Sequence, residues 1–217
     1  MRNREVQHDR RAKEGRVIFT SIPKSGTNWL YHILKLPRGI VSATSSESTV
    51  YKHIKKERIA KGHIYPTPKI IEAAMRHDVR IFLYRDPRDT IVSWYHHCED
   101  RAFITHAFFP WTKHDYDSAP DKMMHIIESL KPFYDGMMKW MRHATHVLKY
   151  DAVKIIPRVE LAPVCDVLGV DIEEAMQRWP KRARMFRTGN MDNWKYEWSE
   201  KHKEAYERIW NSQKEDV

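Results

Sequence analysis

The sequence predicts an α/β fold in which a central parallel sheet is flanked by helices within a single domain. Two β-rich apolar runs, RVIFTSI at 16–22 and DVRIFLY at 78–84, are typical of buried strands. Each run leads into a segment with helical spacing, and strands that alternate with helices favour a parallel sheet. No repeat or flexible linker divides the 217 residues. We therefore expect one domain over 16–217, preceded by a solvated lead-in at 1–15.

The segments around these two runs continue the alternation. RIAKGHI at 58–64 alternates in polarity and indicates a strand, and Pro68 opens a predicted helix. Asp86 suits the N-cap of another helix, with Pro87 in its first turn and Asp89 at the capping-box position. In chain order the predicted helices are 27–35, 68–76, one from 86, 120–143, 157–168, 172–178 and 199–210, with further strands at 40–45 and 146–150, a loop at 186–195, and 46–57 left ambiguous.

The net charge of +9 predicts an anionic partner: a nucleic acid, a phosphorylated cofactor or an acidic glycan. Charge alone does not choose among them. No run approaches the roughly 20 apolar residues of a transmembrane helix, and the first 15 residues lack the apolar core of a signal peptide. Cys98 and Cys165 suggest neither a disulfide framework nor a metal site, so a reducing cytoplasm is expected.

The segment IPKSGTNW at 22–29 joins the first strand to a helix and predicts an anion-binding loop. Backbone N–H groups at a helix N-terminus lack partners and carry partial positive charge. Gly26 lets a phosphate approach the backbone, Ser25 and Thr27 add hydroxyl donors, and Lys24 adds a full charge. Because Lys24 precedes the glycine, the loop is not a Walker A motif. An ordinary strand–turn–helix connection is the alternative.

This loop resembles the P-K-S-G-T-x-W segment of sulfotransferases that use 3′-phosphoadenosine 5′-phosphosulfate (PAPS). RDPRDTIVS at 85–93 resembles the 3′-phosphate motif of the same family, R-[DN]-P-[RK]-D-x-x-x-S. The resemblance implies a P-loop-like 5′-phosphosulfate loop, PAPS as the donor and no metal. For Arg85, the alternative is a salt bridge to Asp86 or Asp89. The residues implied to hold PAPS are Lys24, Ser25, Gly26, Thr27, Asn28, Arg85 and Ser93, with Trp29 near the adenine.

Lys61 and His63 form a candidate catalytic pair. They are two positions apart on a predicted strand and therefore face the same side. An imidazole, with an ordinary pKa of about 6.5, accepts a proton near neutrality, and a nearby lysine disfavours its charged form. KGH resembles the family's K-x-H segment, which implies that His63 is the base and that Lys61 lies near the transferred group. His53 and, more weakly, Glu57 are the alternatives.

Later segments resemble the family less closely. Tyr150 begins a Tyr-Asp pair that resembles the family's Y-E, which implies a place near the adenine, although core packing is the alternative for this ring and for Trp29. Arg187 and Gly189 match the F-R-K-G loop that closes on the 3′-phosphate, but Thr188 departs from it. The family's dimer signature is only partly present, which leaves a dimer in doubt.

The resemblance implies sulfuryl transfer from PAPS to a hydroxyl or amine of an acceptor, either a small molecule or a glycan. A nucleotide or adenylylsulfate kinase-like P-loop enzyme is one alternative, and a PAPS-binding protein without turnover is another. A basic nucleic-acid-binding module is a third, which the two motifs disfavour. We hypothesise a shallow, open acceptor site. Aromatic residues that would line this site, or else belong to the core, are Phe103, Phe108, Phe109 and Trp111.

Overall fold

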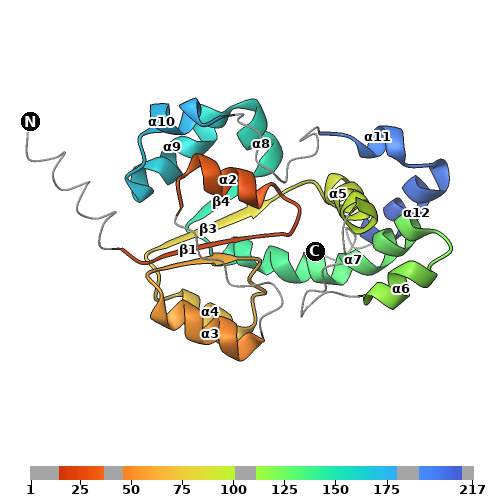
Figure 1. The fold of residues 1–217 in the computed structure, drawn as a ribbon, viewed down its shortest axis with the longest axis horizontal. Coiled ribbons are helices and arrows are strands. Elements are labelled where there is room, and N and C mark those ends of the chain that lie inside the picture. The colour runs from red at the N-terminus through yellow and green to blue at the C-terminus, as the bar shows by residue number, and fades with distance from the viewer. Residues whose placement is uncertain (1–14, 37–45, 101–110, 180–190, 212–217) are drawn as a thin grey trace, which may run out of the picture.

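A parallel sheet lies at the centre of the fold. The computed structural model describes residues 15–36, 46–100, 111–179 and 191–211. Within these residues, four parallel strands form one sheet in the order β2-β1-β3-β4 (Figure 1). The strands are β1 (Val17–Ser21), β2 (Ile59–Gly62), β3 (Val79–Tyr84) and β4 (His146–Lys149). The predicted α/β class with a central parallel sheet is therefore confirmed.

Helices cover both faces of the sheet, which explains why all five residues of β1 are buried (Figure 1). Phe19, Ile81 and Leu148 project into one core, and Ile18 and Phe82 project into the other. The helices on the first face are α2 (Thr27–Ile33), α8 (Tyr150–Ile155), α9 (Pro157–Leu168) and α10 (Ile172–Gln177). The second face carries α3 (Glu47–Lys56), α4 (Pro68–Ala74), α5 (Pro87–Asp100), α7 (Lys122–Met138) and α12 (Glu200–Trp210).

Three shorter elements complete the described part of the chain: α6 (Lys113–Ser118), a 3₁₀ turn (Lys139–Arg142) and α11 (Trp194–Glu197). None of the helices in the described residues combines the length and the hydrophobicity needed to cross a membrane.

Most predicted elements are present, but their ends differ. The strand predicted over 58–64 ends at Gly62, and the strand predicted over 146–150 ends at Lys149, so Tyr150 opens α8. The ambiguous stretch 46–57 is largely the helix α3, whose N-cap Ser46 accepts a hydrogen bond from the Thr49 N–H at 3.3 Å. Helices α6, α8 and α11 were not predicted, and α11 begins at Trp194, inside the loop predicted over 186–195. The strand expected at 40–45 lies outside the described residues.

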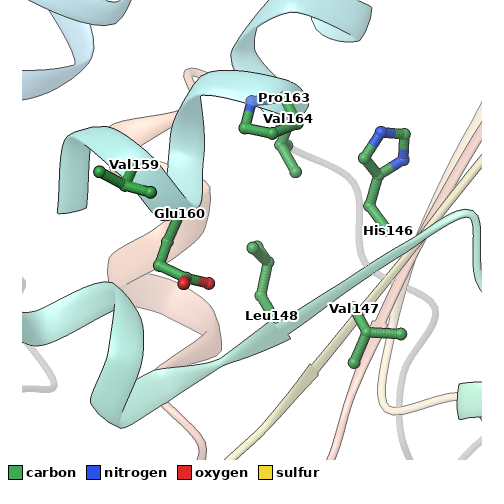
Figure 2. A pocket seen from close by; sticks show the side chains of 7 residues that line it. All are labelled: His146, Val147, Leu148, Val159, Glu160, Pro163 and Val164. Atoms are coloured by element: carbon green, nitrogen blue, oxygen red, sulfur yellow. The ribbon is translucent and has the colours of Figure 1, made fainter. Parts of the chain in front are cut away.

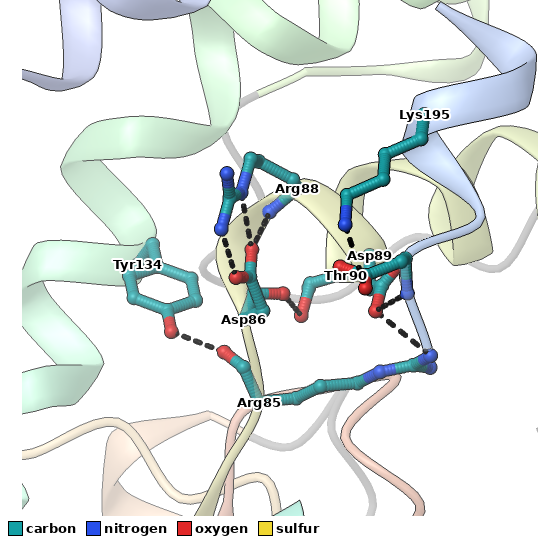
Figure 3. Close-up of polar contacts among 8 residues, drawn as sticks. Arg85, Asp86, Arg88, Asp89, Thr90, Tyr134 and Lys195 are labelled. Carbon is teal, nitrogen blue, oxygen red and sulfur yellow. Dashed lines mark hydrogen bonds and ion pairs between the residues drawn. The ribbon is translucent and has the colours of Figure 1, made fainter. Parts of the chain in front are cut away.

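The start of α5 is built around two carboxylates. Asp86 is the N-cap, as predicted: its carboxylate accepts the Arg88 N–H at 2.8 Å and pairs with the Arg88 guanidinium at 2.6 Å (Figure 3). The capping-box role predicted for Asp89 is wrong. Its carboxylate instead lies 3.4 Å from the Arg85 guanidinium and accepts the Asp192 N–H at 2.9 Å. A buried guanidinium such as that of Arg85 is costly without a nearby negative charge. The ion pair therefore takes the Asp89 carboxylate away from the capping position.

The pair of Asp86 and Arg88 predicts a pH-dependent contribution to stability. Burial raises the pKa of Asp86, but its hydrogen bonds and ion pair with Arg88 lower that pKa to a net value below the usual one. A depressed pKa means that the contribution is complete above the unfolded-state pKa, near 4, and is lost as the pH falls through the folded-state pKa.

Asp86→Ala is therefore expected to lower the free energy of unfolding by about 1–2 kcal/mol at pH 7, because a cap and an ion pair are lost. Asp86→Asn retains the cap and should lose only the part that depends on charge. Urea unfolding at pH 7 and pH 3 measures both variants. The difference between Asp86→Asn and the parent protein should shrink at pH 3, and an unchanged difference would contradict the assigned charge effect.

Candidate functional site

Most of the predicted site residues that the structure describes lie where the four strands end. The register aligns these ends, with the Cα partners Thr20–Gly62, Ser21–Leu83 and Tyr84–Lys149. The residues that follow the strands therefore lie along one edge of the sheet: the loop 22–26, His63, Arg85 and Tyr150. The chain leaves β1 toward β2 on one side and later reaches β3 on the other. The switch point of the sheet, where ligands of such folds bind, thus lies between the loop after β1 and Arg85.

The loop after β1 folds tightly over the first turn of α2. Gly26 has a φ of 86° and Lys24 a φ of 70°, both in the left-handed region. The Ser25 N–H donates to the Ile22 carbonyl at 3.2 Å. Ser25 is fully buried, and its hydroxyl has no hydrogen-bond partner among the described residues. A buried hydroxyl in this position requires an explanation, and a ligand oxygen would supply one.

Arg85 lies at the end of β3 and is almost completely buried, with 6% of its surface exposed. Its guanidinium carbon is 4.6 Å from the centre of the Tyr150 ring. The Arg85 backbone carbonyl accepts a hydrogen bond from the Tyr134 hydroxyl at 2.5 Å (Figure 3). Burial raises the pKa of the Asp89 carboxyl, while the charge of Arg85 opposes this rise. The salt bridge to Asp89 that was the alternative for Arg85 is thus present.

The ring of Tyr150 connects the two motifs. A Cβ placed on Gly26 would lie 2.5 Å from Cε2 of this ring, and the Arg85 guanidinium lies over the same ring. The loop after β1 and the arginine after β3 therefore share a neighbour, although 59 positions separate Gly26 from Arg85 in the sequence. Tyr150 is 1% exposed, and burial raises the pKa of its hydroxyl to about 12.

Lys61 lies in β2, whereas His63 comes directly after this strand, which ends at Gly62 and not at residue 64. The Lys61 ammonium is 4.6 Å from the centre of the Tyr31 ring, and burial lowers the pKa of this amine. His63 Nδ1 lies 3.0 Å from the Ser21 carbonyl oxygen and 3.1 Å from its hydroxyl. The alternatives are placed differently: His53 belongs to α3 on the other face of the sheet, and Glu57 precedes β2 at the opposite edge.

The remaining predicted residues are distributed around this edge. Ser93 is half-buried on α5, next to Trp94, whose ring centre is 5.7 Å from the Lys24 ammonium. Asn28 is exposed, whereas Trp29 is 4% exposed and packs against Tyr150 with ring centres 5.4 Å apart.

Some expectations cannot be placed. Arg187, Thr188, Gly189 and the three phenylalanines of the hypothesised acceptor site lie outside the described residues. Trp111 is 4% exposed and belongs to the core on the α7 face, so the core alternative is the correct one for this ring.

Several contacts at this edge were not found from the sequence. Ser21, Tyr134 and Asp192 reach His63, Arg85 and Asp89 across separations of 42, 49 and 103 residues. Their residue types are common, and no local pattern marks them. Within the described residues, no three His, Cys, Asp or Glu side chains are grouped as a metal would require.

A cavity of about 270 Å³ lies apart from this edge, between β4 and α9 (Figure 2). Its wall includes both apolar side chains and the polar His146 and Glu160, and no predicted site residue lines it. The lining residues are His146, Val147, Leu148, Val159, Glu160, Pro163 and Val164.

Comparisons with known proteins identify the family of the chain. A family model for the sulfotransferase domain matches residues 14–216. The chain belongs to the sulfotransferase domain family. Two curated members, sulfotransferase 6B1 from Pan troglodytes and from Gorilla gorilla gorilla, are each 24% identical to it over 162 residues. These alignments cover 67% of this chain and 49% of each relative, so the chain spans about half the length of the curated relatives it matches.

A solved member of the family has the same fold. The crystal structure of mouse sulfotransferase SULT7A1 complexed with PAP matches with a TM-score of 0.66 and 17% sequence identity. The match covers 94% of this chain and 85% of the mouse protein. At this level of identity, the comparison establishes the common fold.

The contact between Gly26 and Tyr150 can be tested through stability. Gly26→Ala places a side chain at a left-handed φ and against the Tyr150 ring, and should lower the free energy of unfolding by about 2–4 kcal/mol. Tyr150→Leu removes the ring, so Gly26→Ala should cost less in that background. Urea unfolding of the two single variants and the double variant measures the difference. Purely additive effects would contradict the contact.

Proposed function

We propose that this chain is a sulfotransferase that moves a sulfuryl group from PAPS to a hydroxyl or amine of an acceptor. The observation that carries the proposal is the Tyr150 ring, which contacts both the loop around Gly26 and the guanidinium of Arg85. One family motif for each phosphorylated end of PAPS is therefore present at the same sheet edge. Membership of the sulfotransferase domain family supports this reading, as does the PAP complex of the mouse relative.

The residues at this edge fit a doubly phosphorylated nucleotide. The buried Ser25 hydroxyl suits a hydrogen bond to a phosphate oxygen, Gly26 allows the left-handed turn of the loop, and Lys24 supplies charge. Thr27 and Asn28 extend this 5′-phosphosulfate loop. Arg85 would bind the 3′-phosphate together with Ser93. Trp29 and Tyr150 are proposed to lie near the adenine, and the loop of Arg187, Thr188 and Gly189 to close over the 3′-phosphate.

The proposed reaction is an in-line displacement at sulfur. His63 removes the proton of the acceptor as the acceptor oxygen or nitrogen forms a bond to sulfur. The bond from sulfur to the bridging phosphate oxygen breaks, and Lys24 stabilises the charge on that oxygen. Lys61 is assigned to the vicinity of the transferred group. Asp89 holds the Arg85 guanidinium at the sheet edge, so that little reorganisation is needed when a phosphate binds.

We further propose that 16–217 form the catalytic domain and that the protein works in the cytoplasm. Cys98 and Cys165 are both free thiols, which suits a reducing compartment.

Removing the proposed base is the first test of the mechanism. His63→Ala should lower kcat by about 10²–10⁴-fold, the usual contribution of a positioned general base. PAPS affinity, measured by calorimetry, should change little. His53→Ala serves as the matched control because His53 lies on the other face of the sheet. Near-normal turnover of His63→Ala would remove His63 from this role.

Removing the proposed 3′-phosphate ligand is the second test. Arg85→Ala should weaken PAPS binding about 10–100-fold, which is the usual loss of affinity when a charge-assisted hydrogen bond is removed. Binding of adenosine 5′-phosphosulfate, which lacks the 3′-phosphate, should weaken much less. Arg88→Ala is the control, since Arg88 pairs with Asp86 and stacks on Trp194. Equal losses for both nucleotides in the Arg85 variant would count against the assignment.

One screen tests the proposed activity as a whole. Thermal shift with PAPS and with ATP plus Mg²⁺ separates a sulfotransferase from a kinase-like enzyme, because only the former should respond to PAPS in preference to ATP. Transfer from ³⁵S-labelled PAPS to phenols, alcohols, amines and glycans then identifies the acceptor class. A shift with PAPS but no transfer to any acceptor would indicate a binding protein without turnover.

A further inference from the structure

Ser21 contacts Nδ1 of the His63 ring through two of its oxygen atoms. Nδ1 lies 3.0 Å from the Ser21 carbonyl oxygen and 3.1 Å from the Ser21 hydroxyl oxygen. A carbonyl oxygen can only accept a hydrogen bond. This contact therefore requires a proton on Nδ1, and the neutral imidazole then carries its basic lone pair on Nε2.

Ser21 is well suited to fix the orientation of another side chain. It is fully buried at the end of β1, a central strand that is paired on both sides. Its hydroxyl also lies 2.7 Å from the hydroxyl of Thr27, the first residue of α2. The same side chain therefore contacts both the histidine after β2 and the helix that follows the phosphate loop. Rigid elements hold a catalytic group more accurately than loops do.

We propose that Ser21 is a positioning residue that holds His63 with its proton on Nδ1 and directs Nε2 toward the acceptor. This inference rests on the proposed function, in which His63 is the base. The acceptor proton moves to Nε2 while Nδ1–H keeps donating its hydrogen bond to the Ser21 carbonyl. The carbonyl oxygen also stabilises the imidazolium that forms. Through Thr27, the Ser21 hydroxyl fixes the base relative to the loop proposed to bind the 5′-phosphate.

The tautomer can be measured on the unmodified protein. Long-range ¹H–¹⁵N spectra of ¹⁵N-histidine-labelled protein distinguish the two ring nitrogens, and comparison with His63→Gln assigns the His63 signals. The neutral His63 ring should carry its proton on Nδ1. A proton on Nε2 would overturn the proposal. This measurement needs neither turnover nor a Ser21 variant that folds.

A variant tests the hydroxyl. Ser21→Ala should lower kcat about 10-fold, because a misplaced base reacts slowly, and should leave the PAPS dissociation constant within about twofold. Ser21→Thr restores the hydroxyl and should recover most of the lost rate. Ser129→Ala is the control: the Ser129 hydroxyl donates to the His125 carbonyl within α7, away from the sheet edge, so the kcat of this variant should not change. An unchanged kcat for Ser21→Ala would overturn the role of the hydroxyl.

The inference and the function on which it rests fail in different ways. If the unmodified protein transfers no sulfuryl group to any acceptor in the screen, the proposed function is wrong. The His63 spectrum still decides whether Ser21 holds the ring with its proton on Nδ1.

Discussion

The burial of one cation organises the predicted site. Removing the Arg85 guanidinium from water is costly unless an opposite charge accompanies it, and Asp89 provides that charge from the first turn of α5. The Tyr150 ring at the start of α8 lies beneath the guanidinium, and Tyr134 from α7 binds the Arg85 backbone. The Asp89 carboxylate also accepts a hydrogen bond from the backbone N–H of Asp192. The contacts that stabilise the buried Arg85 thus connect α5, α7, α8 and the chain at Asp192, which are distant in the sequence.

Much of the fold could be predicted because its strongest signals are local. The apolar runs of β1 and β3 are buried on both faces, so their composition alone marks them as strands. The N-cap at Asp86 was also correct, because an Asp-Pro pair fixes a helix start through its immediate neighbours. The end of β4 was misplaced at Tyr150, since an aromatic residue suits a strand and the first turn of a helix equally well. The sheet register determines where the strand ends.

The candidate site was partly predictable for a related reason. Its two motifs are contiguous segments, and the order of strands and helices brings both to the carboxyl edge of a parallel sheet. Tyr134, Tyr150 and Asp192, which contact these motifs, lie elsewhere in the chain. The role of Asp89 was misassigned because a capping box is a local pattern, whereas its ion pair depends on the burial of Arg85. Likewise, nothing in the strand sequence distinguishes Ser21 from the other buried polar residue of β1, Thr20.

The backbone conformation and the side-chain charge of Lys24 favour different residues at that position. With a φ of 70°, the backbone there favours glycine, and a residue with a side chain costs about 1–2 kcal/mol. Glycine would relieve this cost but would remove the cation that the proposed chemistry requires. Lysine at position 24 therefore places its charge beside the phosphate loop at the cost of backbone strain, and this strain is the local stability cost of the proposed site.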